Sequence, residues 1–272
     1  MIDEANFEVT RSDDNLVGFI AFNRPKRGNA VNLDMWRQLP EIVRQLEKDV
    51  KVIVLRGLGK HFCTGIDLDV LNTITTLDGN KVEDALKFRD LVLMMQESIT
   101  SLERCTVPVI AAVHGCCYGA GIDIITACDI RYSTQDAVFS VKEVDVGLAA
   151  DLGTLQRLPK IVGDGVAREL CLTARDFGGE EARHAHLVTR TFPDHKSLMR
   201  GCCDLAHSIA NKDEFAVQGT KHILLHAREN STESALNYVA VWNTALLKKE
   251  QILRQLAKRK RGGGAKAPKS KL

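Results

Sequence analysis

The apolar positions of the first half of the chain alternate between short continuous runs and longer periodic segments. The runs at 16–22, 52–55 and 108–113 have the length and composition of buried strands. Between them, apolar residues recur at helical spacing over 33–49, where Asn32 is a suitable N-cap, and over 82–102. Strands that alternate with long helices predict an α/β fold with crossover connections.

After about residue 173 the pattern becomes helical. We predict helices at 180–186, 195–210, 214–228 and 232–257. Tyr238 and Trp242 in the last of these suit either a partner surface or packing within the chain. The expected organisation is an α/β core over 1–190, a helical region over 191–257 and a basic flexible tail over 258–272.

Composition and charge narrow the class of protein. The chain has 272 residues, of which 44% are hydrophobic and 26% charged, as in many soluble enzymes. No apolar run approaches the roughly 18 residues that a membrane span requires. The net charge of +2 includes seven basic and no acidic residues over 258–271, so the remainder carries 30 basic against 35 acidic residues, or −5. This balance disfavours a nucleic-acid-binding body.

Cysteines, histidines and the N-terminus carry no further signal. The eight cysteines include no C-x-x-C pair and the eight histidines no H-E-x-x-H motif, so we expect free thiols and no metal. The start, Met1-Ile-Asp-Glu-Ala5, is acidic, which disfavours a secretory signal and a mitochondrial presequence.

Three carboxylates, Asp123, Glu143 and Asp151, lie in segments that are otherwise rich in apolar and small residues. A buried carboxylate is costly unless it is paired or has a raised pKa, and acids with raised pKa values transfer protons at neutral pH. Each one alone has an ordinary interpretation, as a helix cap, a surface charge or a turn former. Together they predict an acid–base site.

Two glycine-containing loops, 59–68 and 114–123, each follow an expected buried strand and place Gly-Ile-Asp at an expected helix start. Free N–H groups at a helix N-terminus favour negative charge, and two that converge form an oxyanion hole. The alternative is tight strand-to-helix packing. The chain lacks the complete glycine spacing of a dinucleotide site and any phosphate-binding Gly-Lys-Ser/Thr loop, so NAD binding is disfavoured.

The segments 19–26, 61–68, 114–123 and 153–160, taken in this order, resemble the crotonase (enoyl-CoA hydratase/isomerase) superfamily. Segments 127–132 and 141–158 are similar to its Δ3,5-Δ2,4-dienoyl-CoA isomerase branch. The resemblance implies a crotonase-like spiral of ββα units with a helical C-terminal trimerisation subdomain, and assembly as a homo-trimer or hexamer. It also implies isomerisation of 3,5-dienoyl-CoA to 2,4-dienoyl-CoA in fatty-acid β-oxidation, without a cofactor, because coenzyme A is part of the substrate.

The same resemblance implies the site residues. The thioester oxygen would be bound by the backbone N–H groups of Ile66 and Ala120, the latter at a position where many relatives have glycine. The implied substrate-binding residues are Lys26, Arg27, Thr64, Gly65, Ile66, Asp67, Leu68 and Ala120. Lys26 and Arg27 would contact the CoA phosphates, with a solvated turn as the alternative, and Asp67 is better explained as a helix-start residue than as a catalyst.

A dienoyl shift removes a proton at C2 and returns one at C6, so a carboxylate at each end suits it. We expect Glu143 to serve C2 and Asp151 to serve C6, although the two roles are interchangeable. Asp123 would orient or tune Glu143. Hydratases of the family carry glutamates at the positions of both Asp123 and Glu143, and usually a glycine-like residue in place of Asp151. An enoyl-CoA hydratase remains the first alternative, and an RNA-associated or scaffolding oligomer is the alternative of another class.

The sequence ends in Ser270-Lys271-Leu272, and a C-terminal Ser-Lys-Leu is read by the peroxisomal import receptor. It follows a flexible basic segment that would hold it away from the folded body. We therefore expect import into peroxisomes, or into glycosomes where the organism has that variant.

Overall fold

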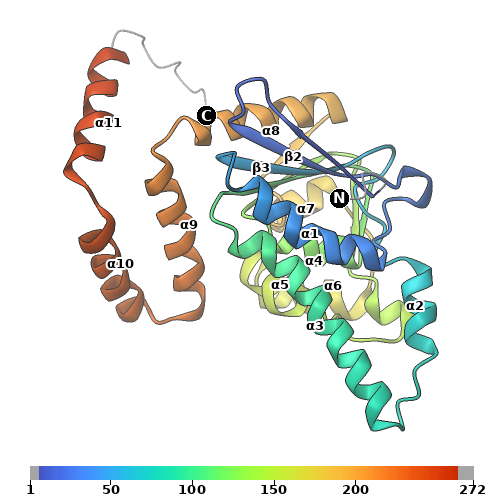
Figure 1. Ribbon diagram of the computed structural model, residues 1–272. Coiled ribbons are helices and arrows are strands. Elements are labelled where there is room, and N and C mark those ends of the chain that lie inside the picture. Colours follow the sequence, from blue (N-terminus) through green and yellow to red (C-terminus); the bar gives the residue numbers. More distant parts are fainter. Residues whose placement is uncertain (1–5, 263–272) are drawn as a thin grey trace. The chain divides into compact units, whose positions relative to one another are not determined.

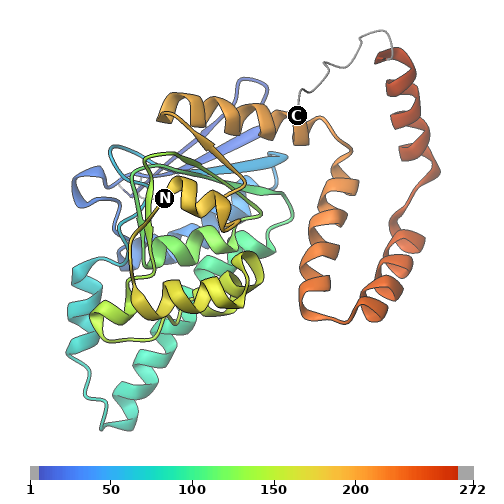
Figure 2. The ribbon, with the colours of Figure 1, turned by 180° about the vertical axis from the view of Figure 1, so that it is seen from behind.

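The computed structural model describes residues 6–262, with side chains described as far as residue 257. The chain divides into two compact units after Asn211, and each is described by itself. Figures 1 and 2 show the first unit as a twisted sheet with helices on both faces, and the second unit as helices alone.

The strands of the first unit are β1 (Phe7–Arg11), β2 (Val17–Phe22), β3 (Val52–Gly57), β4 (Val109–Val113), β5 (Cys116–Tyr118), β6 (Ile130–Thr134), β7 (Val138–Ser140), β8 (Phe177–Gly178) and β9 (Arg190–Phe192). Its helices are α1 (Leu33–Leu46), α2 (Leu68–Thr75), α3 (Val82–Arg104), α4 (Ala120–Ala127), α5 (Thr154–Val162), α6 (Asp164–Thr173), α7 (Gly179–His184) and α8 (His195–Ala210), with 3-10 turns η1 (Pro25–Arg27) and η2 (Glu143–Val146).

Six strands form the main sheet in the order β1-β2-β3-β4-β6-β9. Only β1 is antiparallel to its neighbour, and the other neighbours are parallel, as the alternation of strands and helices predicts. The expected runs at 16–22, 52–55 and 108–113 are β2, β3 and β4. The N-cap of α1 is also confirmed, because the Asn32 side chain accepts a hydrogen bond from the Met35 N–H.

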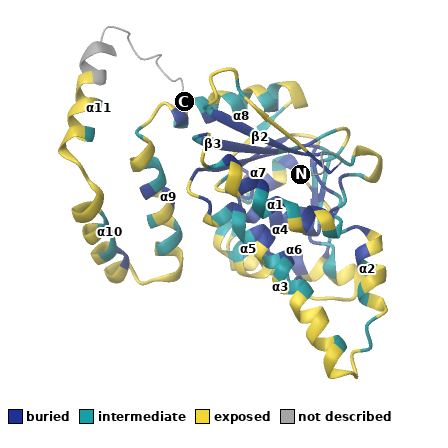
Figure 3. Ribbon diagram, viewed as in Figure 1, coloured by how far each residue is buried: buried dark blue, intermediate teal, exposed yellow. Residues whose placement is uncertain are grey.

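Both faces of the main sheet are buried, which explains why its central strands are continuously apolar. Ile53 and Leu55 of β3 pack in the core that includes α1, α3 and α4. Val52 and Val54 face the other way and pack with residues of α8 such as Leu198. Figure 3 shows the central strands as mostly buried, with single intermediate positions in β2 and β3. Because α8 completes this second core, the first unit extends to Asn211 and not to residue 190.

The second unit contains α9 (Glu214–Glu229), α10 (Thr232–Leu246) and α11 (Lys249–Gly262). The single helix expected over 232–257 is therefore two helices. Leu247 is extended (φ −74°, ψ 118°), and the Gln251 side chain accepts a hydrogen bond from the Lys248 N–H at 3.2 Å. A glutamine three residues after the N-cap stabilises the start of a helix in this way. This single residue is a weaker sequence signal than the apolar stripe, which continues across the break and predicts one helix.

The structure also bears on the predicted roles of Tyr238 and Trp242 and on the predicted flexible tail. Tyr238 stacks on His226 with ring centroids 4.0 Å apart, and Trp242 stacks on His222 at 4.4 Å, so both aromatic residues pack within the unit. The backbone of α11 stays helical to Gly262, so the segment expected to be a flexible tail begins as helix, consistent with the Lys and Arg residues at 258–261. Ser270-Lys271-Leu272 lies outside the described residues. None of the described helices is long and apolar enough to cross a membrane.

Candidate active site

The two glycine-containing loops lie side by side at the ends of β3 and β4. Backbone hydrogen bonds join them, from the Cys63 N–H to the Cys116 carbonyl (3.1 Å) and from the Tyr118 N–H to the Cys63 carbonyl (3.0 Å). A small sheet in the order β5-β7-β8 continues from this contact, with Cys63 forming a bridge to Cys117. The contact brings Gly65 and Gly119 together, since a Cβ added to Gly119 would lie 3.9 Å from the Gly65 Cα.

The N–H groups of Ile66 and Ala120 follow these glycines. Ile66 is bridged to Val31 through the hydrogen bonds of its two neighbours, so its own N–H points the other way. Ala120 is the first residue of α4, where the helix has no internal acceptor for the N–H. Within the described residues neither N–H has an acceptor. Two neighbouring backbone N–H groups without acceptors are the donors that an oxyanion hole requires.

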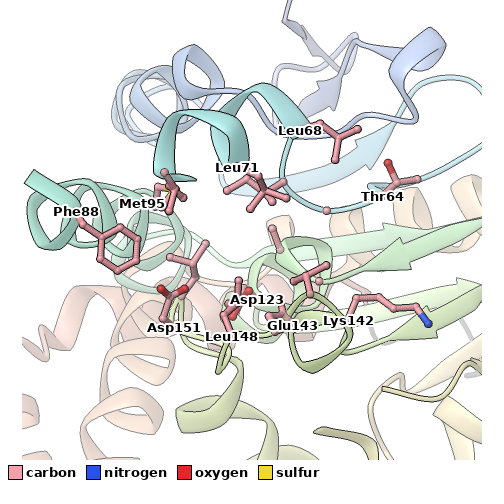
Figure 4. A pocket seen from close by; sticks show the side chains of 17 residues that line it. Thr64, Leu68, Leu71, Phe88, Met95, Asp123, Lys142, Glu143, Leu148 and Asp151 are labelled. Carbon is pink, nitrogen blue, oxygen red and sulfur yellow. The ribbon is translucent and has the colours of Figure 1, made fainter. Parts of the chain in front are cut away.

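A pocket opens beside these N–H groups. Its lining residues are Thr64, Gly65, Ile66, Leu68, Leu71, Ile74, Phe88, Met95, Gly119, Ala120, Asp123, Lys142, Glu143, Val146, Leu148, Asp151 and Leu152. In the view of Figure 4, the carboxylates follow one wall, and Leu68 and Leu71 lie on the opposite wall. The predicted carboxylates therefore share one largely apolar cavity with both predicted amides.

Asp123 is the most buried of the three carboxylates, with 1% of its surface exposed. It lies in the first turn of α4 and accepts a hydrogen bond from the Thr154 N–H, 2.6 Å away, at the N-terminus of α5. Burial raises the pKa of Asp123 to about 6, although the Thr154 hydrogen bonds and the Arg157 charge act in the opposite direction. Asp123 is thus fixed in place from two helices.

Glu143 begins the η2 turn, lines the pocket and lies close to Gly119. Its Oε1 would lie 3.3 Å from a Cβ added to Gly119, and its Oε2 is buried without a hydrogen-bond partner in the described protein. Burial raises the pKa of Glu143 to about 7, and the neighbouring charges of Asp123 and Asp151 add to the effect. A carboxyl group with this pKa is able both to accept and to donate a proton near neutral pH.

Asp151 lies in the loop that leads into α5 and is half-buried. Burial raises the pKa of its carboxyl group, against a hydrogen bond from its own backbone N–H. Figure 4 shows its side chain near those of Phe88 and Met95, on the side of the pocket away from Lys142. In the view of Figure 4 the three carboxylates follow one another along the pocket, and the charge of Asp151 still acts on both Asp123 and Glu143.

The remaining predicted residues divide into two groups. Thr64, Gly65, Ile66, Leu68 and Ala120 line the pocket. Asp67 does not, because it is the N-cap of α2 and pairs with Arg24 at 2.5 Å and with Arg27 at 3.2 Å, as its helix-start interpretation predicts. Lys26 and Arg27 lie in η1 outside the lining, so their contact with CoA stays a prediction.

Sequence reasoning missed the apolar wall and several supporting residues. Phe88 and Met95 enter the pocket from α3, and Lys142 lines it while pairing with Asp176 at 2.9 Å. Val146, Leu148 and Leu152 lie close in sequence to Glu143 and Asp151 and line the pocket. Their apolar character beside carboxylates was the sequence signal that could have predicted them as pocket residues. Among the described residues, no group of His, Cys, Asp and Glu is arranged to hold a metal ion.

Comparison with known proteins agrees with this geometry. The family described as enoyl-CoA hydratase/isomerase matches residues 12–258. The chain belongs to this family. It is 46% identical over 261 residues to the peroxisomal Δ(3,5)-Δ(2,4)-dienoyl-CoA isomerase of Arabidopsis thaliana, covering 93% of this chain and 94% of that protein. It is 45% identical over 242 residues to the mitochondrial enzyme of the same name from Rattus norvegicus, covering 87% and 74%.

Solved structures of proteins in this family have the same fold as this chain. An enoyl-CoA hydratase from Bacillus anthracis aligns with a TM-score of 0.83 at 26% identity, covering 94% of this chain and 96% of that one. A Thermobifida fusca protein assigned as an enoyl-CoA hydratase, in complex with CoA, aligns with a TM-score of 0.80 at 30% identity, covering 94% and 96%. The crotonase fold is confirmed.

Proposed function

We propose that this protein isomerises 3,5-dienoyl-CoA to 2,4-dienoyl-CoA. The observation that carries the proposal is the presence of a third carboxylate, Asp151, in the pocket that holds Asp123 and Glu143. The Arabidopsis and rat relatives, named as dienoyl-CoA isomerases, support it. The Thermobifida structure with CoA supports a CoA thioester as the class of substrate.

The reaction begins at the thioester. With the thioester oxygen on the Ile66 and Ala120 N–H groups, C2 lies next to the oxyanion hole, where Glu143 approaches Gly119. Glu143 removes a C2 proton, and the electron pair passes into an enolate conjugated with both double bonds, whose charge rests on the thioester oxygen. The double bonds shift by one position as Asp151, farther along the pocket, donates a proton to C6. One proton leaves and one is returned, so the product is an isomer.

The electrostatics of the pocket suit this cycle. Burial raises the pKa of Glu143 to about 7 and also raises the pKa of Asp151, so both carboxyl groups exchange protons more readily near neutral pH than ordinary surface carboxylates do. Asp123 takes no part in the transfer. Its fixed position on the α5 N-terminus and its charge favour a protonated Glu143 once a proton has been removed from the substrate.

The competing activity is hydration of a 2-enoyl-CoA by Asp123 and Glu143. One assay separates the two activities: purified protein is given a 3,5-dienoyl-CoA, and the absorbance of the conjugated 2,4-dienoyl-CoA is followed. A parallel assay follows loss of the 2-enoyl-CoA chromophore. We expect rapid isomerisation and little hydration. Hydration without isomerisation would overturn the proposal in favour of a hydratase.

For the assembly, we propose a homo-trimer or hexamer formed through the second unit. Large apolar side chains are exposed on all three of its helices, including Phe215 (66%), Val241 (67%) and Leu253 (53%). A second copy of the chain is the partner that the family resemblance implies. Light scattering at micromolar concentration should give the mass of three or six chains, and a monomer would contradict the proposal.

The alternative that the basic tail binds RNA is tested by an electrophoretic mobility-shift assay with RNA, on the protein with and without residues 258–272.

For the compartment, we propose peroxisomes, and glycosomes in an organism that has them. The likeness to the peroxisomal Arabidopsis protein supports the proposal, while the rat relative is mitochondrial. The Ser270-Lys271-Leu272 sequence supplies the testable address. A fluorescent fusion at the N-terminus should collect in puncta and become diffuse when Leu272 is deleted. An unchanged distribution after the deletion would count against this compartment.

A further inference from the structure

The position of the Asp151 carboxylate depends on its own backbone. Its hydrogen bond comes from its own N–H, and the described residues provide no side-chain donor to it. Asp has a single methylene between the backbone and the carboxyl group, so any movement of the peptide is passed directly to the carboxylate. Whatever fixes the peptide of Asp151 therefore also fixes the proton carrier at that end of the pocket.

The backbone on the far side of Asp151 is held at successive positions. Arg157 of α5 donates to the Leu152 carbonyl at 3.5 Å and is itself paired with Glu103 of α3 at 3.0 Å. Gly153 has a φ of +126°, and a Cβ there would lie 1.9 Å from the Arg157 Nη1. The Thr154 N–H is held by Asp123. These contacts fix the loop after Asp151, but none of them is made to the backbone carbonyl of Asp151 itself.

That group is Gln96. Its Nε2 donates a hydrogen bond to the Asp151 carbonyl oxygen at 2.6 Å, across 55 positions of sequence. Within the described residues, Gln96 is the one side chain that hydrogen-bonds to this peptide. Gln96 follows Met95, which is 2% exposed and lines the pocket, so the helix that shapes the apolar wall also holds the backbone of Asp151.

We propose that Gln96 is a positioning residue for the dienoyl shift, because it sets the distance between the Asp151 carboxylate and the distal carbon of the substrate. The inference rests on the proposed function. Proton transfer requires the reacting atoms to be placed closely, and a displacement of about 1 Å costs on the order of 100-fold in rate. Removing the Gln96 donor should therefore lower kcat and leave KM little changed, since Gln96 itself does not line the pocket.

The variant that tests this is Gln96→Met, which keeps the length of the side chain and its helical character but has no N–H donor. The matched control is Gln45→Met, since Gln45 is an exposed helical glutamine of α1 whose side chain donates a hydrogen bond to Glu41. We expect kcat for isomerisation to fall about 10- to 100-fold in Gln96→Met. The control should keep the wild-type kcat, and the melting temperature of each variant shows that the protein is folded.

A second readout separates positioning from a merely structural role. Turnover in D2O, analysed by NMR, gives the deuterium incorporated at C2 and at C6 of substrate and product. Gln96→Met should reproduce, in milder form, the labelling pattern of Asp151→Asn and not that of Glu143→Gln. This expectation holds whichever of the two carboxylates serves C2, because the comparison is between variants.

Each outcome is decisive. If the wild-type protein isomerises and Gln96→Met turns over as fast as Gln45→Met, the inference is wrong while the proposed function stands. A labelling pattern that follows Glu143→Gln would also overturn it. Wild-type protein that forms no conjugated dienoyl-CoA would overturn the proposed function and this inference with it.

Discussion

Gly119 is the residue whose replacement tests the oxyanion hole most sharply. Its backbone has φ 50° and ψ −117°, a combination that residues with a Cβ rarely adopt. A Cβ would also lie 3.3 Å from the Glu143 Oε1, closer than ordinary van der Waals contact. Gly119→Ala therefore introduces both backbone strain and a contact with a catalytic carboxylate.

The size of the effect follows from these two features. Holding a residue with a Cβ in this region costs about 1–3 kcal/mol. The strain is relieved by rotating the peptide that joins residues 119 and 120, and this peptide carries the Ala120 N–H. Loss of one oxyanion donor typically lowers kcat by about 10²–10³. We therefore expect Gly119→Ala to lose activity by that factor whether or not its melting temperature falls.

The assay is the rate of conjugated dienoyl-CoA formation, measured beside thermal unfolding. Gly165→Ala is the control, because Gly165 lies in α6 with nothing within 4 Å of an added Cβ and has an ordinary φ. The control should keep its activity. Gly119→Ala with wild-type kcat would refute the assignment of the Ala120 N–H to the oxyanion hole.

Two further predictions concern the carboxylates. Because the charge of Asp123 raises the pKa of Glu143, Asp123→Asn should move the acidic limb of the kcat/KM profile to lower pH; an unmoved limb would contradict the coupling. Because burial raises the pKa of Glu143 from 4.5 to about 7, the folded state binds a proton that the unfolded chain releases, so stability falls as pH rises through this range. Glu143→Gln should therefore raise the melting temperature near pH 8 and lose this gain by about pH 5, and an equal shift at both pH values would count against the raised pKa.

Much of the fold was predictable because its signals are local. The continuous apolar runs of β3 and β4 and the Asn32 cap of α1 are each contained in a few neighbouring residues. The extent of the core was not predictable in the same way. An amphipathic pattern shows that α8 has an apolar face but does not show that the face covers the main sheet, and this contact places the unit boundary after Asn211.

The candidate site shows the same division. Asp123, Glu143 and Asp151 were predictable because a carboxylate in an apolar segment is costly and therefore informative. Their partners were not, since the Thr154 N–H lies 31 positions from Asp123 and Gln96 lies 55 positions from Asp151. Gln96 has no distinguishing pattern on a long helix, and only the fold shows which carbonyl it contacts.

The central claim is that the third carboxylate makes this pocket an isomerase site, and turnover of Asp151→Asn with a 3,5-dienoyl-CoA tests it most directly. Affinity for a CoA ligand is measured in parallel by calorimetry. A proton carrier contributes about 10²–10⁴ in rate, so we predict a fall in kcat of that size with CoA-ligand affinity nearly unchanged. Asp151→Asn that turns over like the wild-type protein would contradict the account and leave hydration by Asp123 and Glu143 as the better explanation of the pocket.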